Sequence, residues 1–143
     1  MSDETLPTYD SLQVGDVVAS RTITLTRDSL VRYAAASGDF NPIHYNDAFA
    51  QSVGLPGVIA HGMLTMGQGA SVVEEWAGAG NVVDFQARFT RPIPVPALDG
   101  AQVSIAATVG ALDDELKRAR IDVAVTFDGA KVLGKAQAVV DCA

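Results

Sequence analysis

The sequence predicts an α+β domain in which one long helix is covered by an antiparallel sheet. No Lys or Arg occurs from Tyr33 to Ala87, and the apolar run over residues 60–77 has no charge before Glu74, so we expect a helix that is buried nearly all round. The second half of the chain predicts strands, because apolar residues alternate there with polar or small ones. A sheet with one apolar face can cover such a helix, and residues 1–143 are enough for a single domain with its own core.

The N-terminal third predicts a lead-in, a strand and a helix. Residues 1–13 hold turn formers without a periodic pattern, which indicates a loosely held segment. A strand is expected over residues 15–26, where four apolar residues stand among polar neighbours. Thr26 is a suitable N-cap and Asp28 suits the positive end of a helix dipole, so we expect a helix that runs to about Ser37.

A loop and a short helix are expected between this helix and the long one. Gly38 can adopt the left-handed conformation that ends a helix, and Pro42 disfavours helical geometry at the residue before it. The chain therefore leaves the helix and forms a loop. Asn46 or Asp47 can cap a short helix that runs through Gln51.

The C-terminal half predicts a meander of four strands, over residues 83–90, 103–109, 121–127 and 132–140. Asp128 and Gly129 form a two-residue sequence that is typical of a tight hairpin turn. The last two strands are therefore expected to be antiparallel neighbours.

Asp39 and His44 are a candidate acid/base pair. Outside helical geometry, a five-residue spacing lets the loop curl so that the carboxylate and the imidazole face one place. Two such groups that share one water or one substrate hydroxyl are sufficient for acid/base chemistry. A structural alternative stays open, in which Asp39 and Asn41 close Asx turns and His44 is a hydrogen-bonded structural histidine. Their occurrence together beside Gly38 and Pro42 favours chemistry.

Three glycines in the long helix suggest close approaches to its backbone, since each costs about 1 kcal/mol relative to Ala in a helix interior. For Gly67 and Gly69 we expect tight contact with the sheet. Gly62 lies in the first turn, where unpaired amides and the positive dipole end suit a developing oxyanion. His61, beside it, is expected to be a polar orienting group at the mouth of the pocket.

The composition argues against several classes of protein. A net charge of −7 disfavours nucleic acid as a partner. The acidic N-terminal residues lack the features of an export signal and no uninterrupted apolar run is long enough for a membrane span, so we expect a cytoplasmic protein without a membrane partner. The single Cys142 allows no internal disulfide, and two histidines with one remote cysteine give no usual zinc spacing, so no metal is expected. Ser71 lacks the Gly-x-Ser-x-Gly context of a nucleophile.

Three segments resemble a known family. The run from Tyr33 to His44 (YAAASGDFNPIH), continuing to Ala50, is similar to the signature of the MaoC-like (R)-specific hydratases and dehydratases, as are residues 59–67 (IAHGMLTMG) and 88–90 (RFT). The resemblance covers one small domain and implies the hot-dog fold. Within the family, the sequence is most similar to the HadB type, the catalytic B subunit of the mycobacterial (3R)-hydroxyacyl-acyl-carrier-protein dehydratase.

The resemblance implies that Asp39 and His44 are the catalytic dyad and that the Gly62 amide helps to hold the thioester oxygen. Asn41, as a brace for the loop, and His61 complete the candidate substrate site. The implied reaction is dehydration of (3R)-hydroxyacyl-acyl-carrier protein to the trans-2-enoyl product in long-chain, mycolic-type fatty acid elongation, without a cofactor. We expect neutral His44 to be the base and protonated Asp39 the acid in this direction.

The resemblance also implies a dimer. A heterodimer with a non-catalytic hot-dog subunit is expected, and a homodimer is the alternative. Two other functions stay open: a stand-alone (R)-specific enoyl-coenzyme A hydratase, and a non-catalytic hot-dog module that binds acyl chains. Because carrier proteins are acidic, a chain of net charge −7 needs a local basic patch to bind one. The candidates are Lys117, Arg118, Arg120, Arg88 and Arg91, with a solvated strand face as the simpler alternative.

Overall fold

The computed structural model describes residues 6–143, and the first five residues of the predicted lead-in lie outside that range. In chain order, the elements are η1 (Tyr9–Ser11), β1 (Val17–Leu25), α1 (Arg27–Ser37), η2 (Pro42–His44), α2 (Asp47–Ser52), α3 (Gly62–Ala77), β2 (Val82–Phe89), β3 (Ala101–Asp113), β4 (Arg118–Phe127), β5 (Ala130–Lys131) and β6 (Leu133–Asp141).

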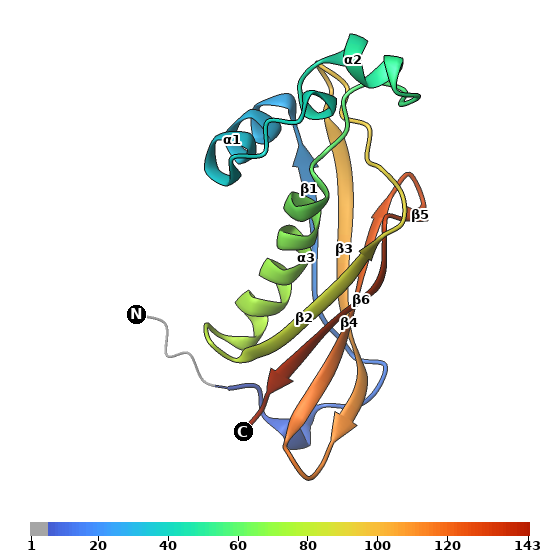
Figure 1. Ribbon diagram of the computed structural model, residues 1–143. Coiled ribbons are helices and arrows are strands. Elements are labelled where there is room, and N and C mark those ends of the chain that lie inside the picture. Colours follow the sequence, from blue (N-terminus) through green and yellow to red (C-terminus); the bar gives the residue numbers. More distant parts are fainter. Residues whose placement is uncertain (1–5) are drawn as a thin grey trace.

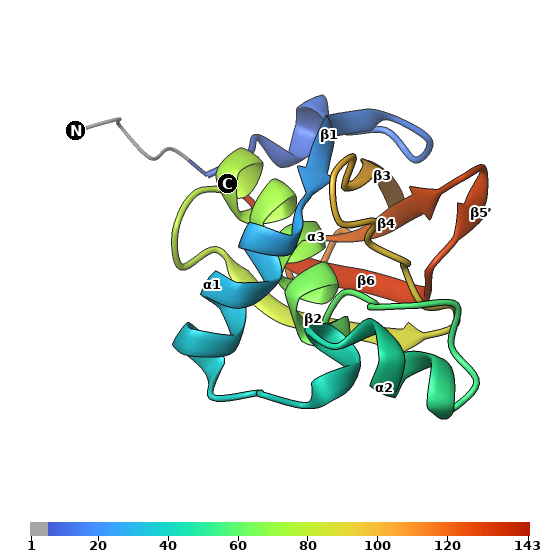
Figure 2. The same cartoon turned by 90° about the horizontal axis from the view of Figure 1, so that it is seen from above.

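The strands form one antiparallel sheet in the order β1-β3-β4-β6-β2, with β5 paired to β4. α3 lies along one face of this sheet, and α1 and α2 lie near the N-terminal end of α3 (Figure 1). Viewed from above, the sheet curves around α3 (Figure 2). The predicted α+β class, with the hot-dog arrangement of a long helix and an antiparallel sheet, is confirmed.

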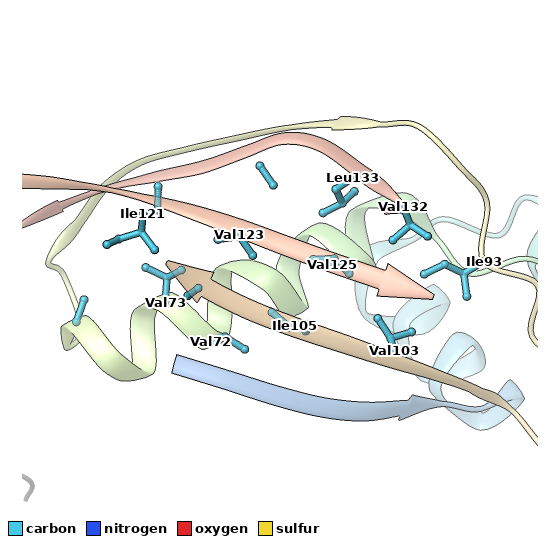
Figure 3. Close-up of a cluster of buried hydrophobic side chains, with 14 of the residues drawn as sticks. Val72, Val73, Ile93, Val103, Ile105, Ile121, Val123, Val125, Val132 and Leu133 are labelled. Atoms are coloured by element: carbon cyan, nitrogen blue, oxygen red, sulfur yellow. The ribbon is translucent and has the colours of Figure 1, made fainter. Parts of the chain in front are cut away.

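The core fills the space between α3 and the sheet. Val72 and Val73 of α3 point toward Ile105, Ile121 and Val125 of the central strands (Figure 3). Alternate residues of β3 and β4 are buried, as the sequence pattern predicts for strands with one apolar face. Each large side chain that is fully buried contributes about 1.5–3 kcal/mol through the hydrophobic effect, so this layer fixes α3 on the sheet.

The long helix begins two residues later than predicted, at Gly62. Residues 60 and 61 precede the helix instead, because the Ala60 amide donates to the Ile93 carbonyl at 2.9 Å beside the bridge between Ile59 and Pro94. These contacts hold the entry to α3 against the segment that follows β2.

The prediction that α3 is buried nearly all round is wrong. Its buried residues lie on one face, whereas Met63, Gly67 and Glu74 are exposed on another. The reason is that the described chain supplies a sheet on only one side of the helix. None of the helices within residues 6–143 combines the length and the apolarity that a bilayer crossing needs.

The two mid-helix glycines have different environments. A Cβ atom built on Gly69 would lie 3.4 Å from Val123 and 3.5 Å from Val125, so the predicted close contact with the sheet is confirmed. The same prediction is wrong for Gly67, where a Cβ atom would have no neighbour within 4 Å. Gly67 lies on the face of α3 that points away from the sheet, so no sheet residue approaches it.

The predicted loose lead-in is wrong for residues 7–12. Tyr9 is buried, its amide donates to the Ala143 carbonyl at 2.8 Å, and the Ala143 amide donates to the Pro7 carbonyl at 2.9 Å. The two ends of the described chain are therefore held together, and both lie near the lower end of the sheet in Figure 1.

The strands of the second half lie where alternation predicts them, with β2 and β6 shifted by one residue and β3 and β4 longer than predicted. β3 ends at Asp113 and β4 begins at Arg118. Their hairpin therefore includes polar residues beyond the alternating apolar pattern. Asp128 and Gly129 both have positive φ, at 52° and 75°, which confirms the tight turn. The chain after it forms two strands, since β5 ends at Lys131 and β6 begins at Leu133.

Candidate active site

The loop after α1 holds its shape through short-range hydrogen bonds. Gly38 caps α1 with φ 77°, as predicted. The Asn41 amide donates to Asp39 Oδ1 at 3.2 Å, and the Ile43 amide donates to Asn41 Oδ1 at 3.2 Å. The Asx turns of the structural alternative are therefore present. They engage only one oxygen of the Asp39 carboxyl group, so Oδ2 is available for another role.

His44 is held in one orientation by the start of the α3 segment. Its side chain is 9% exposed, and its Nδ1 atom lies 2.8 Å from the Ile59 carbonyl oxygen. Because a carbonyl oxygen only accepts, Nδ1 carries the hydrogen, and the lone pair of a neutral His44 lies on Nε2. Nε2 is 3.9 Å from Asp39 Oδ2, so the two predicted residues do meet.

A salt bridge between α1 and α2 helps to position the segment that holds the Ile59 carbonyl. Arg27 donates to Asp47 at 2.9 Å and to the Val95 carbonyl at 2.6 Å, and Asp47 Oδ1 also accepts from the Val58 amide at 2.9 Å. The hydrogen bond from the Val58 amide lowers the pKa of Asp47, and the nearby Arg27 acts in the same direction, whereas burial opposes them. The sequence predicts Asp47 only as a possible cap, because its partners come from distant segments.

His61 lies behind the dyad, with 1% of its surface exposed. Its ring stacks on His44 with centroids 3.9 Å apart and planes at 23°, and the Tyr33 ring meets it edge-on at 4.7 Å. Nε2 donates to the Asp39 carbonyl at 3.1 Å, while Nδ1 has no hydrogen-bond partner within residues 6–143. Burial lowers the pKa of His61, and the adjacent His44 acts in the same direction. His61 is therefore a neutral support for both members of the dyad.

The N-terminus of α3 borders the same pocket as the dyad. Gly62 is the first helical residue, and its N-cap, His61, makes no side-chain capping bond. The first amides of a helix have no partner inside it, so the Gly62 N–H can donate to a ligand. A Cβ atom at this position would lie 3.0 Å from the Phe89 ring, which indicates a narrow space at the helix start.

These groups line one pocket of about 470 Å³. Asp39, His44 and Gly62 contribute its polar side, and apolar residues such as Ile43, Ile93 and Leu133 form much of the rest. Asn41 and His61 do not line the pocket, although both contact Asp39. The predicted position of His61 at the mouth of the pocket is therefore wrong, because its ring is buried against His44 and Tyr33. Thr65, Phe89 and Arg91 also line it. The sequence pattern does not single out Thr65 or Phe89, although both lie in segments that resemble the family, residues 59–67 and 88–90. Arg91 follows the second of these segments directly.

The side chains of Asp39, His44 and His61 gather closely enough to suggest a metal site, with possible ligand atoms within 4.8 Å of one another. The ring geometry argues against one. The two imidazoles stack, so their lone pairs do not converge, and His44 Nδ1 and His61 Nε2 both face carbonyl oxygens. The two nitrogens that remain, His44 Nε2 and His61 Nδ1, lie in stacked ring planes, so they do not converge with the Asp39 carboxylate as the three protein ligands of a catalytic zinc do.

The predicted basic cluster does not form. Arg118 and Arg120 pair with Asp141 and Asp122. Along β6, the partner of Arg118 is seven residues from Gly134, the partner of Arg88, which is roughly 23 Å at strand spacing. The five cations therefore divide between opposite ends of the sheet.

Comparison with known proteins identifies the family. Residues 11–127 match the family described as "MaoC like domain". The chain belongs to this family. A curated relative of the MaoC-like domain, 3-hydroxyacyl-thioester dehydratase X of Mycobacterium tuberculosis, is 39% identical over 82 residues, which are 57% of this chain and 29% of the relative.

Solved structures give the same family. A MaoC-like dehydratase superposes with a TM-score of 0.92 at 37% identity, over 96% of this chain and 43% of the other. The (R)-hydratase PhaJ1 of Pseudomonas aeruginosa superposes with a TM-score of 0.81 at 28% identity, over 96% of this chain and 86% of the other. The MaoC-like domain thus spans less than a third of the curated relative and less than half of the first structure.

The buried neutral His61 predicts sensitivity to acid. In the folded protein its pKa lies below the ordinary 6.5, so below about pH 6.5 the unfolded chain binds more protons and the free energy of unfolding falls. Urea unfolding at about pH 7.5 and about pH 5.5 should show a larger loss for the parental protein than for His61→Gln, which keeps a donor for the Asp39 carbonyl but does not titrate. Equal losses in the two proteins would contradict a neutral, buried His61.

Proposed function

We propose that this MaoC-like domain eliminates water from (3R)-3-hydroxyacyl thioesters to give trans-2-enoyl thioesters. The observation that carries the proposal is the 3.9 Å separation of His44 Nε2 and Asp39 Oδ2 at the side of an apolar pocket. This separation is too long for a direct hydrogen bond, but one oxygen atom about 2.8 Å from both groups fits between them. That oxygen is the β-hydroxyl of the substrate or the water that it becomes.

The elimination assigns one proton transfer to each group. His44 Nε2 takes the proton from the α carbon, and the electrons of that C–H bond form the double bond as the β-hydroxyl leaves. Asp39 Oδ2 protonates the leaving hydroxyl, so that water departs. The proton on His44 then returns to Asp39, which restores both groups. Because the two atoms lie only 3.9 Å apart, both transfers occur on one face of the substrate.

Enolate-like charge on the thioester oxygen needs a donor, and we assign this role to the Gly62 amide. The helix dipole and the absence of a capping side chain favour negative charge at this end of α3. The apolar walls exclude water and strengthen this interaction. Asn41 and His61 position the dyad in this account, Asn41 through the Asp39 carboxyl group and His61 through the Asp39 carbonyl and the His44 ring.

Acyl carrier protein is the carrier that we propose, in type II long-chain elongation of the mycolic kind. The similarity to the M. tuberculosis dehydratase supports this assignment. The reverse reaction, hydration of an enoyl-coenzyme A by a stand-alone enzyme, is the second candidate, and it is supported by the similarity to PhaJ1 over nearly its full length. A non-catalytic acyl-binding module is disfavoured because Asp39 and His44 are both in place.

A second hot-dog unit is the partner that we propose, first as a non-catalytic subunit and otherwise as another copy of this chain. β2 is an edge of the sheet, with no strand on its outer side within residues 6–143. Phe89 on this edge and Met63 on α3 are more than half exposed beside the pocket. Exposed edges and apolar surface of this kind are usually covered in the working protein.

Removal of either dyad member should abolish most turnover. We expect Asp39→Asn and His44→Gln to lower turnover by about 10²–10⁴-fold, which is the usual contribution of an acid/base group. The control is Asp28→Asn, since Asp28 is an exposed carboxylate on α1 that pairs with Arg32. Dehydration of a 3-hydroxyacyl thioester, followed by absorbance of the enoyl product, measures the effect. Folded variants with near-parental turnover would refute the assignment.

Gly62→Pro should remove the proposed oxyanion donor without breaking the helix. Proline is favoured at the first helical position, and His61 before it already has extended backbone angles of −62° and 130°. Gly62→Ala is the control, because it adds a Cβ atom near Phe89 but keeps the amide. We expect kcat to fall by about 10²–10³-fold in Gly62→Pro relative to Gly62→Ala. Equal kcat values would exclude the amide as the donor.

Particle mass should report two hot-dog units. Light scattering of the purified chain, alone and after co-expression with a related hot-dog chain, should give a dimer, because the β2 edge and the open face of α3 are uncovered in the single chain. Higher activity of the mixed particle would favour the heterodimer. A fully active monomer would contradict both forms of the partner proposal.

A further inference from the structure

The positive charges that lack an ion-pair partner gather at one place. The sequence has ten Lys and Arg residues. Six of them form ion pairs, namely Arg21, Arg27, Arg32, Lys117, Arg118 and Arg120. The other four, Arg88, Arg91, Lys131 and Lys135, have no carboxylate at ion-pair distance among residues 6–143, and all four are exposed.

Strand pairing brings these four residues to one end of the sheet. Arg88 is the ladder partner of Gly134, which precedes Lys135. The Arg91 amide donates to the carbonyl of Val132, which follows Lys131. Figure 1 shows the tip of β2 reaching the region of β5 in accordance with this pairing. We call these four residues the β2–β5 patch.

Arg91 connects the patch to the active-site pocket. Arg91 lines the pocket of the dyad and also a second groove of about 260 Å³ that runs beside it. Val132, between Lys131 and Leu133, lines both cavities as well. Within residues 6–143, Asp128 in the hairpin turn is the one carboxylate that lines the second groove, so positive charge is in excess there among the described residues. A thioester arm that enters the pocket would therefore pass Arg91, the member of the patch that lines it.

We propose that the β2–β5 patch is the docking surface for the acidic acyl carrier protein that presents the substrate, an inference that rests on the proposed function. Charge complementarity supports this proposal. A chain of net charge −7 repels an acidic partner over most of its surface, so docking needs a local region of opposite sign. Ion pairing neutralises the other cations, whereas these four have no carboxylate partner within residues 6–143, and one of them, Arg91, lines the pocket that the substrate arm enters.

The test compares two double variants with the same change in net charge. Arg88→Glu with Lys131→Glu reverses the patch, and Arg32→Glu with Lys117→Glu reverses two exposed cations elsewhere. Each protein, with its partner subunit if one is required, receives the same 3-hydroxyacyl group on acyl carrier protein, on coenzyme A and on uncharged N-acetylcysteamine. Affinity for the carrier protein is measured separately by calorimetry at low and high salt, so it does not depend on turnover.

We expect the patch variant to lose at least about 10-fold in kcat/KM on the carrier-protein substrate through a higher KM, with turnover of the N-acetylcysteamine substrate unchanged. Carrier affinity should fall in the patch variant and not in the control, and high salt should reduce the difference. Equal behaviour of the two variants, or no carrier binding by the parental protein, would overturn the proposal. An equal or larger loss with coenzyme A would overturn it too, because the patch would then bind the coenzyme phosphates. Carrier binding without turnover of any thioester would refute the proposed function alone and leave the docking surface standing.

Discussion

The hydrogen bond between His44 Nδ1 and the Ile59 carbonyl is the interaction on which the proposed chemistry depends. It selects the tautomer of a neutral His44 and directs the Nε2 lone pair toward Asp39. The carbonyl is held in turn by neighbouring contacts. The Val58 amide donates to Asp47, and the Ala60 amide donates to Ile93, so the residues on both sides of Ile59 are fixed. A loop dyad thus obtains its geometry from the strand-like segment that leads into α3.

The same segment joins the dyad to the helix terminus. His61 follows Ala60 and supports both members of the dyad by stacking on His44 and by donating to the Asp39 carbonyl. Gly62 follows at once, with its amide unpaired at the start of α3. The core that packs α3 on the sheet therefore sets the position of the oxyanion donor. Residues 59–62 connect this donor to the acid/base pair, so the two are fixed relative to each other.

The local part of this site is predictable from the sequence. Gly38, Pro42 and the spacing from Asp39 to His44 define a loop by short-range rules, and the structure brings the two side chains together. The role of the Ile59 carbonyl is not predictable, since any residue supplies a carbonyl group. The uncovered face of α3 is not predictable either, because an uncharged helix face has the same composition whether its own sheet or another subunit covers it. The prediction of a basic cluster is wrong for a related reason. Arg118 and Arg120 form ion pairs with Asp141 and Asp122, and their closeness in the sequence to other cations does not reveal these partners.

In the proposed mechanism, Asp39 and His44 act together on one face of a thioester chain. The decisive experiment incubates a trans-2-enoyl thioester with the assembled protein in deuterated water and analyses the product by mass spectrometry, chiral chromatography and proton NMR, whose vicinal coupling distinguishes the two faces of the α carbon. We expect a (3R)-3-hydroxyacyl product that carries one deuterium on the α carbon, on the same face as the new hydroxyl group. Recovery of unchanged enoyl thioester, or a product with deuterium on the opposite face, would contradict the mechanism.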